Sequence, residues 1–364
     1  MRPTWVDIDL DAIAHNIGIF RDLVSPAGVC AVVKADAYGH GDVPVAEAAL
    51  SAGATCLAVA LVAEGARLRE AGIDAPILLL SEPPLNSAPA VLQWDLIPTV
   101  YTRPMIEALA GLASTPIPVH LKVDTGMHRV GASADDAIEF ARLITESSGL
   151  DLAALWTHFA VAEEDAEFTR LQIERFETTM KELRSAGIHV PVVHAANTAG
   201  AIAFPEARYD LVRVGIGMYG LQPAPTVGAE LQLHPAMRVV SAVAHLRRHP
   251  AGTRPSYGRR RPLPADGRVA SVPIGYADGM PRLLSSWGEV LIRGKRYPLA
   301  GTVTMDYLVV DVGLDDVEVG DEVVLIGRQG NEAITVEEWA ERVGTINYEI
   351  VCQIGPRMPR RYNP

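Results

Sequence analysis

The chain has 364 residues, 49% of them hydrophobic, and a formal net charge of −12 from 32 basic and 44 acidic side chains. A chain of this length can bury a large core and suggests two domains. The acidic balance, without a basic stripe, argues against nucleic acid or an anionic membrane as a partner. No apolar run is long enough to span a bilayer and no signal-peptide pattern opens the chain, so we expect a cytoplasmic protein with its three cysteines reduced.

The first two predicted elements are a strand and a helix. Residues 4–10 alternate apolar and polar side chains, as in a half-buried strand. Asp11 is expected to cap a helix that places its apolar residues between 13 and 24 on one face.

Short apolar runs then alternate with amphipathic helical patterns, such as 43–52, 63–71 and 164–186. Eight successive βα units predict a TIM barrel. An open dinucleotide-binding sheet would carry a Gly-rich fingerprint, which this sequence lacks. The predicted strands cover residues 29–34, 56–61, 76–80, 96–100, 117–123, 151–158, 191–196 and 209–214.

After about residue 230 the pattern changes to short strand-like runs separated by Gly, Pro and Asp turns, which predict an antiparallel, barrel-like β domain. One helix is expected there, opened by the capping-box pattern Thr335-Val-Glu-Glu338. We therefore expect a barrel over residues 1–230 and a β domain over residues 231–364, with residues 1–10 as a candidate strand of the second domain. The predicted strands are 237–246, 269–273, 289–292, 308–312 and 322–326.

Functional residues of a TIM barrel lie at the carboxyl ends of its strands. Five polar residues end or closely follow predicted strands: Lys34, Asp124, His158, Asn197 and Arg213. A lysine at such a place is most often a solvated head on an apolar stem. The functional alternative is an amine that forms a Schiff base with a carbonyl cofactor.

The stretch Ala31-Val-Val-Lys-Ala-Asp-Ala-Tyr-Gly-His-Gly41 resembles the cofactor-lysine signature of the alanine racemases, which use pyridoxal phosphate (PLP). The resemblance covers nearly the whole chain. It implies racemisation of L- and D-alanine (EC 5.1.1.1), which would supply D-alanine for peptidoglycan. Further blocks match in the same order, at residues 120–129, 156–159, 194–198, 212–215, 256–258, 275–279, 304–306 and 345–349.

A racemase removes a proton from one face of a carbanion and returns one to the other, so it needs two bases. The resemblance implies that Lys34 holds PLP and serves one face, and that Tyr257 serves the other. It also implies that His158 and Arg213 connect the tyrosine to the cofactor ring. A guanidinium cannot protonate the ring nitrogen, so the ring would stay a weak electron sink.

The resemblance further implies a phosphate clasp and a carboxylate clamp. Arg129 is the implied clamp, since its planar guanidinium matches a carboxylate. Asn197 is expected to fix the geometry beside the clasp. The clasp residues are Tyr38, Thr198, the backbone of Gly215 and Ile216, and Tyr348.

Lys122 alternates with Asp124 along the fifth predicted strand, so both are expected to point into the barrel. Burying a charged lysine is costly. In similar enzymes this lysine is carbamylated and orients the arginine, whereas the plain alternative is an ion pair with Asp124. We favour carbamylation, because the anion beside Arg129 would offset the cost of burial.

In alanine racemases the β domain of one chain completes the barrel site of another. The resemblance therefore implies a head-to-tail homodimer in which Tyr257, Met305 and Asp306 reach the partner's barrel. Tyr276 and Arg282 match positions that line the entrance of the family's substrate channel. No metal site is expected.

Three departures leave the substrate breadth open. His128 stands where relatives usually have glycine, Thr302 where some have an arginine near the entrance, and Glu163 where an aspartate is expected. Serine or another small amino acid is an alternative substrate, because a small pocket rejects a hydroxyl poorly. A PLP decarboxylase of related architecture is a second alternative. A non-enzymatic PLP-binding protein is a third, disfavoured by the β domain with Tyr257.

Overall fold

A computed structural model describes residues 2–285 and 287–363; Met1, Ser286 and Pro364 lie outside the described residues. The chain divides into two compact units. The barrel unit comprises Asp11–Ala37 and Asp42–His234, and the β unit comprises Met1–Leu10, Tyr38–Gly41 and Pro235–Pro364. No described helix is both long and apolar enough to cross a membrane.

The predicted TIM barrel is confirmed. Its strands form two parallel four-stranded sheets, in the orders β4-β3-β2-β9 and β5-β6-β7-β8. Leu78 bridges Ile97 at one seam, and the Arg213 N–H donates to the Ala196 carbonyl at 3.0 Å at the other, so the barrel closes. The strands are β2 (Gly28–Val32), β3 (Cys56–Val59), β4 (Ile77–Leu79), β5 (Thr99–Val100), β6 (Ile117–Lys122), β7 (Leu150–Trp156), β8 (Val192–His194) and β9 (Leu211–Val214).

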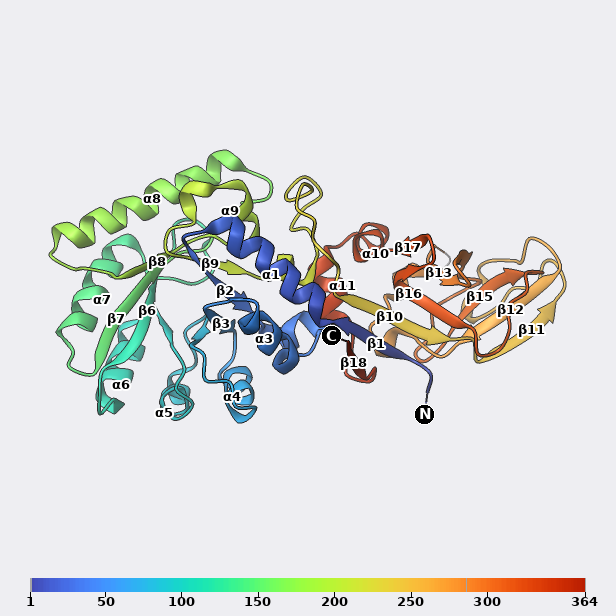
Figure 1. Cartoon of the computed structure of the whole chain (residues 1–364), viewed down its shortest axis with the longest axis horizontal. Coiled ribbons are helices and arrows are strands. Elements are labelled where there is room, and N and C mark those ends of the chain that lie inside the picture. Colours follow the sequence, from blue (N-terminus) through green and yellow to red (C-terminus); the bar gives the residue numbers. More distant parts are fainter. Residues whose placement is uncertain (1, 286, 364) are drawn as a thin grey trace. The chain divides into compact units, whose positions relative to one another are not determined.

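Helices α4 to α8 lie outside these strands (Figure 1). The first helix begins at Leu10, so Asp11 lies within its first turn, and the prediction that Asp11 caps it was wrong. A carboxylate in the first turn still interacts well with the helix dipole, which is why it marks a helix start. The helices are α1 (Leu10–Val24), α3 (Asp42–Ser51), α4 (Val62–Glu70), α5 (Ala88–Gln93), α6 (Arg103–Leu112), α7 (Ala134–Glu146), α8 (Ala166–Ser185) and α9 (Thr198–Ala203), with 3-10 turns η1 (Leu85–Ser87), η2 (Pro205–Ala207) and η3 (Ile216–Tyr219).

The segment after Lys34 is a left-handed helical turn, α2 (Lys34–Gly39). It lies between the predicted strand 29–34 and the predicted helix 43–52, where no element was predicted. Four consecutive non-glycine residues, 35–38, have φ between 52° and 54°. A left-handed conformation costs roughly 1–2 kcal/mol per non-glycine residue. Strain of this kind is kept where the surroundings fix it, typically at functional sites. Glu64 contributes here, because its carboxylate accepts the Ala35 N–H at 2.7 Å.

The β unit is mainly antiparallel, as predicted. A seven-stranded sheet has the order β14-β13-β16-β10-β1-β18 with β17 paired to β16, and a second sheet has the order β11-β12-β15. β1 lies between β10, antiparallel, and β18, parallel. The strands are β1 (Trp5–Asp9), β10 (Met237–Ala242), β11 (His245–His249), β12 (Gly267–Val272), β13 (Glu289–Ile292), β14 (Lys295–Pro298), β15 (Leu308–Gly313), β16 (Glu322–Gln329), β17 (Glu332–Ile334) and β18 (Arg360–Asn363).

The predicted helix start is confirmed at α10 (Val336–Val343), where Thr335 is the N-cap and its hydroxyl accepts the Glu338 N–H at 3.1 Å. The Glu338 carboxylate pairs with Arg296 and Arg342. The expectation of a single helix in this domain was wrong, since α11 (Asn347–Gln353) follows. That helix has seven residues and no side-chain cap, so it leaves little trace in the sequence pattern. Three 3-10 turns complete the unit: η4 (Tyr257–Arg259), η5 (Tyr276–Asp278) and η6 (Arg282–Leu284).

Candidate active site

The predicted polar residues of the barrel unit gather at the carboxyl ends of its strands. Lys34 follows β2, Asp124 follows β6 and His158 follows β7. Asn197 follows β8, and Arg213 lies near the end of β9. The carboxyl ends of parallel barrel strands share one face, where active sites of this fold lie.

Arg213 is the best-connected group on this face, with a side chain only 3% exposed. Its Nη2 donates to the backbone carbonyls of Thr157 and Ala195 at 2.9 and 2.8 Å. The other contacts go to histidines, with Nη1 2.8 Å from His194 Nδ1 and Nη2 3.1 Å from His158 Nδ1. Among the described residues Nε has no acceptor and no carboxylate pairs with Arg213. Burial lowers the pKa of Arg213 only to about 10, so the guanidinium stays charged near pH 7. Its Nε–H and one hydrogen of Nη1 remain for a ligand.

The contacts of Arg213 fix the proton positions on a chain of histidines. A guanidinium only donates, so the Nδ1 atoms of His158 and His194 accept and their protons lie on Nε2. His194 Nε2–H then donates to His120 Nδ1 at 3.1 Å. Burial, and then the charge of Arg213, holds the pKa of His158 and His194 well below the usual value and lowers that of His120 to about 4. All three rings are neutral near pH 7, and His158 offers a donor.

The sequence interpretation did not give His120 or His194 a role. Both lie within matched blocks, and His120 shares the inward face of β6 with Lys122. The alternation of His120 with Lys122 along β6 was the sequence pattern that could have indicated His120 as a site residue. The contact between His194 and Arg213 joins residues of two different strands, so no local sequence pattern predicts it.

We expect the free energy of unfolding to fall as the pH drops from about 6.5 to about 4. His120 titrates at about 4 in the folded chain, against about 6.5 when unfolded, so the unfolded chain binds more protons in this window. The contribution of neutral His120 to the free energy of unfolding is fully present above the pKa of the unfolded chain. Roughly 3 kcal/mol of it is lost as the pH falls toward the pKa of the folded chain. Urea unfolding at several pH values measures this. His120→Gln should flatten the slope, the exposed His189→Gln should not, and equal slopes in all three proteins would contradict the assignment.

Asp124 organises the loop after β6. Its Oδ1 accepts the backbone N–H groups of Gly126, Met127 and His128 at 2.9, 2.9 and 3.1 Å. Burial alone would raise the pKa of Asp124, but these donors and the His128 ring lower it below its usual value. Among the described residues Asp124 makes no ion pair with Lys122, so that alternative was wrong. His128 has φ 54°, a left-handed conformation that glycine adopts without strain.

Lys122 ends β6 with its side chain 3% exposed. Its Nζ lies 4.3 Å from the centre of the Trp156 ring. Burial, followed by the charges of Arg213 and Arg129, lowers the pKa of Lys122 to about 7, with Asp124 opposing. A large share of this side chain is therefore the neutral amine near neutral pH. Arg129 itself is exposed and pairs with no carboxylate among the described residues.

The loops after β8 and β9 join at Thr198, whose hydroxyl accepts the Gly215 N–H at 3.0 Å. That N–H, predicted to bind phosphate, is therefore engaged within the protein. The Thr198 proton remains available, because the hydroxyl accepts in this bond. Asn197 caps α9 through the Gly200 N–H at 2.9 Å. The backbone of Ile216 opens η3 next to these residues.

In the β unit, Tyr257 projects from a tightly held turn. The Thr302 hydroxyl donates to the Tyr257 carbonyl at 2.7 Å, and the Ser256 hydroxyl donates to the Thr302 carbonyl at 2.6 Å. The Tyr257 residue is 74% exposed. Thr302 is 2% exposed and anchors this turn through both of these bonds.

The other predicted residues of this unit surround the segment that follows Thr302. Tyr276 N–H donates to the Thr304 carbonyl at 3.0 Å. The η6 turn that holds Arg282 also reaches this segment, because the Ser285 hydroxyl accepts the Val303 N–H at 2.9 Å. Met305 and Tyr276 are 53% and 43% exposed, so this face offers large side chains to a ligand or partner.

Three further predicted residues of the β unit are placed by side-chain contacts. Asp306 forms an ion pair with Arg357 at 2.7 Å, so its carboxylate is engaged within the unit. Tyr38 and Tyr348 lie near each other, with ring centres 6.3 Å apart. Burial raises the pKa of Tyr38, so its hydroxyl stays protonated and can donate.

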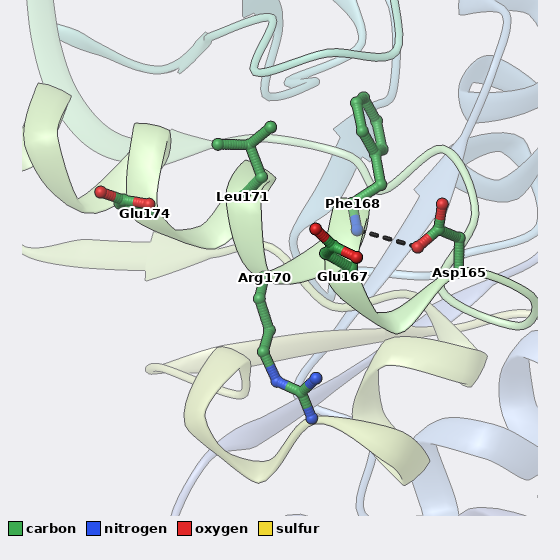
Figure 2. A pocket seen from close by; sticks show the side chains of 6 residues that line it. All are labelled: Asp165, Glu167, Phe168, Arg170, Leu171 and Glu174. Carbon is green, nitrogen blue, oxygen red and sulfur yellow. Dashed lines mark hydrogen bonds between the residues drawn. The ribbon is translucent and has the colours of Figure 1, made fainter.

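One hollow of the barrel unit lies along the start of α8. Its lining is Asp165, Glu167, Phe168, Arg170, Leu171 and Glu174 (Figure 2). Asp165 caps the helix there by accepting the Phe168 N–H at 2.9 Å. The hollow contains none of the predicted site residues, and its carboxylates suit neither a phosphate nor a substrate carboxylate.

The chain matches known proteins along its length. Sequence profiles of the alanine racemase N-terminal and C-terminal domains match residues 8–223 and 236–362. An alanine racemase of Nostoc sp. is 44% identical over 99% of this chain and 95% of its own length. Among solved structures, alanine racemase from Bacillus anthracis with bound L-Ala-P is 38% identical, covers 100% of this chain and 96% of that one, and has a TM-score of 0.93. That from Streptomyces lavendulae is 36% identical, covers 100% and 98%, and has a TM-score of 0.94. The chain therefore belongs to the alanine racemase family.

Proposed function

We propose that this chain interconverts L- and D-alanine with PLP bound at Lys34. The observation that carries the proposal is Arg213, which keeps its charge and free N–H donors on the barrel face where Lys34 follows β2. This arrangement suits the nitrogen of a pyridine ring, which accepts a hydrogen bond without taking the proton. Appearance of D-alanine from L-alanine, followed by chiral chromatography with added PLP, tests the activity.

The donors on this face fit the cofactor. Lys34 supplies an amine for its carbonyl, Arg213 a donor for its ring, and Thr198 a hydroxyl proton for its phosphate. When bound, PLP would supply the electron sink that makes the substrate Cα–H acidic. The protein would supply position, proton acceptors and exclusion of water.

Lys34 and Tyr257 are the proposed pair of bases. Lys34 would act at one face of the substrate, and Tyr257 of a partner copy at the other. His158 supports the second role, because its Nε2–H is a donor that would stabilise a phenolate. Arg213, bonded to the other nitrogen of the same ring, adds positive charge.

Lys122 is the proposed site of carbamylation. Its neutral amine would attack the carbon of CO2 and release one proton, which leaves a carbamate anion. Lys122 reaches this neutral form near pH 7 because it is buried among the charges of Arg213 and Arg129. The carbamate would then orient Arg129, the proposed clamp for the substrate carboxylate.

We further propose a head-to-tail homodimer with shared sites. Tyr257 and Met305 are exposed in the β unit, whereas Lys34, His158 and Arg213 lie in the barrel unit. Large apolar side chains exposed together often mark an interface. The same unit also exposes Leu283, Trp287 and Tyr307.

Mixing two inactive variants tests the sharing directly. Lys34→Ala and Tyr257→Phe chains, unfolded and refolded together, should regain about a quarter of wild-type activity, because half of the random dimers carry one intact site. Each variant refolded alone is the control. No regained activity in a mixture that sedimentation shows to contain dimers would contradict a shared site.

A further inference from the structure

Trp156 lies against two buried basic residues of the barrel face, Lys122 and Arg213. It ends β7, in register with Lys122 of β6 on one side and with His194 of β8 on the other. Lys122 Nζ is 4.3 Å from the ring centre and Arg213 Cζ is 4.6 Å from it. Lys122 on β6 and His194 on β8 thus flank Trp156 in register on opposite sides, and Arg213 is bonded to that histidine.

The indole itself is held firmly. Trp156 is 2% exposed, and its Nε1–H donates to the Thr99 hydroxyl at 3.2 Å. The His194 ring stacks on it at 5.4 Å, with 10° between the planes. A ring fixed by a hydrogen bond and a stacking neighbour can define where its own neighbours lie.

The charges around Lys122 make this ring important. The charges of Arg213, Arg129 and Lys34 all disfavour its ammonium form, and that of Asp124 favours it. Both faces of an indole carry negative electrostatic potential and attract cations. An aliphatic side chain of similar size would exclude water equally well but would offer no such attraction.

We infer that Trp156 is a positioning residue whose ring keeps the Lys122 ammonium and the Arg213 guanidinium apart and stabilises each of them. The arrangement itself is independent of the proposed function, and only the role assigned to it rests on that function. The ring would hold the Arg213 guanidinium in position for the cofactor. It would also stabilise the ammonium form of Lys122 until CO2 reacts with the neutral amine. A carbamate would be repelled by the ring face and would turn toward Arg129.

Cyanate is a small probe that tests the charge of Lys122 without turnover. Isocyanic acid adds across an N–H bond of the neutral amine and gives a stable carbamoyl-lysine. PLP-loaded protein in CO2-free buffer is labelled across a pH series, and peptide mass spectrometry reports the rate at Lys122. Dividing by the rate at Lys181, an exposed lysine of α8, cancels the pH dependence of the reagent.

We expect Trp156→Leu to lower the labelling midpoint of Lys122 by about one pH unit, since an attraction of this type is worth about one unit of pKa. Trp156→Phe should lower it by less, because phenyl is a weaker partner. Thr99→Val, which keeps the ring, should leave it within a few tenths of a unit.

An unchanged or raised midpoint in Trp156→Leu would overturn the inference, and so would an equal fall in the leucine and phenylalanine variants. If the leucine variant does not fold by circular dichroism, the phenylalanine variant decides: a fall supports the inference and no fall overturns it. Labelling requires no turnover, so a failure of the proposed racemase activity would be seen separately.

Discussion

Lys34→Ala will lose the yellow colour of bound cofactor and will lower alanine racemisation by at least ~10⁴-fold. The substitution removes both the amine that would bind the cofactor carbonyl and one of the two proposed bases. It should leave the fold intact, because the Lys34 side chain is only half-buried. The measurements are the visible absorption spectrum after gel filtration with PLP and the initial rate of D-alanine formation.

Lys181→Ala, at an exposed position on the outer helix α8, is the matched control and should behave as the wild type. Borohydride reduction of the wild type should also attach the cofactor covalently to the peptide that contains Lys34. Attachment at another lysine, or a coloured and active Lys34→Ala protein, would refute the assignment.

Tyr257→Phe will lower turnover by about 10³-fold while the cofactor stays bound, because the loss of a general base typically costs 10²–10⁴-fold. The backbone of the turn is held through Thr302 and Ser256, so the ring should keep its place. One enantiomer of alanine should still exchange its α-proton with solvent through Lys34, whereas the other should not. Proton NMR of each enantiomer in deuterated buffer measures this.

Tyr209→Phe is the matched control for the loss of a phenol. The Tyr209 hydroxyl is buried and has no hydrogen-bond partner among the described residues, so its removal should change neither activity nor cofactor binding. If Tyr257→Phe racemises alanine at a rate near that of the wild type, the second base is another group.

The fold was predictable because the local spacing of apolar residues indicates its strands and helices. Apolar runs of five to eight residues between amphipathic helices mark the barrel strands, and the N-cap pattern at Thr335 marks α10. Weak or strained elements were not predictable. The left-handed turn α2 is formed by alanine, aspartate and tyrosine, which give no sign of positive φ, and its cost is met by contacts such as that of Glu64.

The proposed catalytic residues came from resemblance, and their partners came from the structure. Strand ends pointed to Lys34, His158 and Arg213, because in this fold function lies there. The contacts that set their charge and tautomer are tertiary, as with His194 against Arg213 and Trp156 against Lys122. Their residue types alone do not distinguish them from ordinary core residues.

Gln172 is another residue whose tertiary contacts could not be predicted from the sequence. Gln172 is fully buried in α8, and its amide donates to the His158 carbonyl at 3.2 Å and to the Thr125 hydroxyl at 3.1 Å. It also accepts the Ala160 N–H at 2.9 Å. It thereby ties the loops after β6 and β7 together. The sequence does not distinguish a polar residue that connects two loops from an ordinary polar residue of an amphipathic helix.

The most direct test of racemisation by two bases is the fate of the α-proton. PLP-loaded protein is given L-alanine in deuterated water, and both enantiomers are separated early in the reaction and examined by NMR and mass spectrometry. We predict D-alanine that carries deuterium at Cα, while the remaining L-alanine still carries mostly protium. D-alanine that retains the original protium would contradict two bases, and the absence of both D-alanine and exchange would contradict the proposed activity itself.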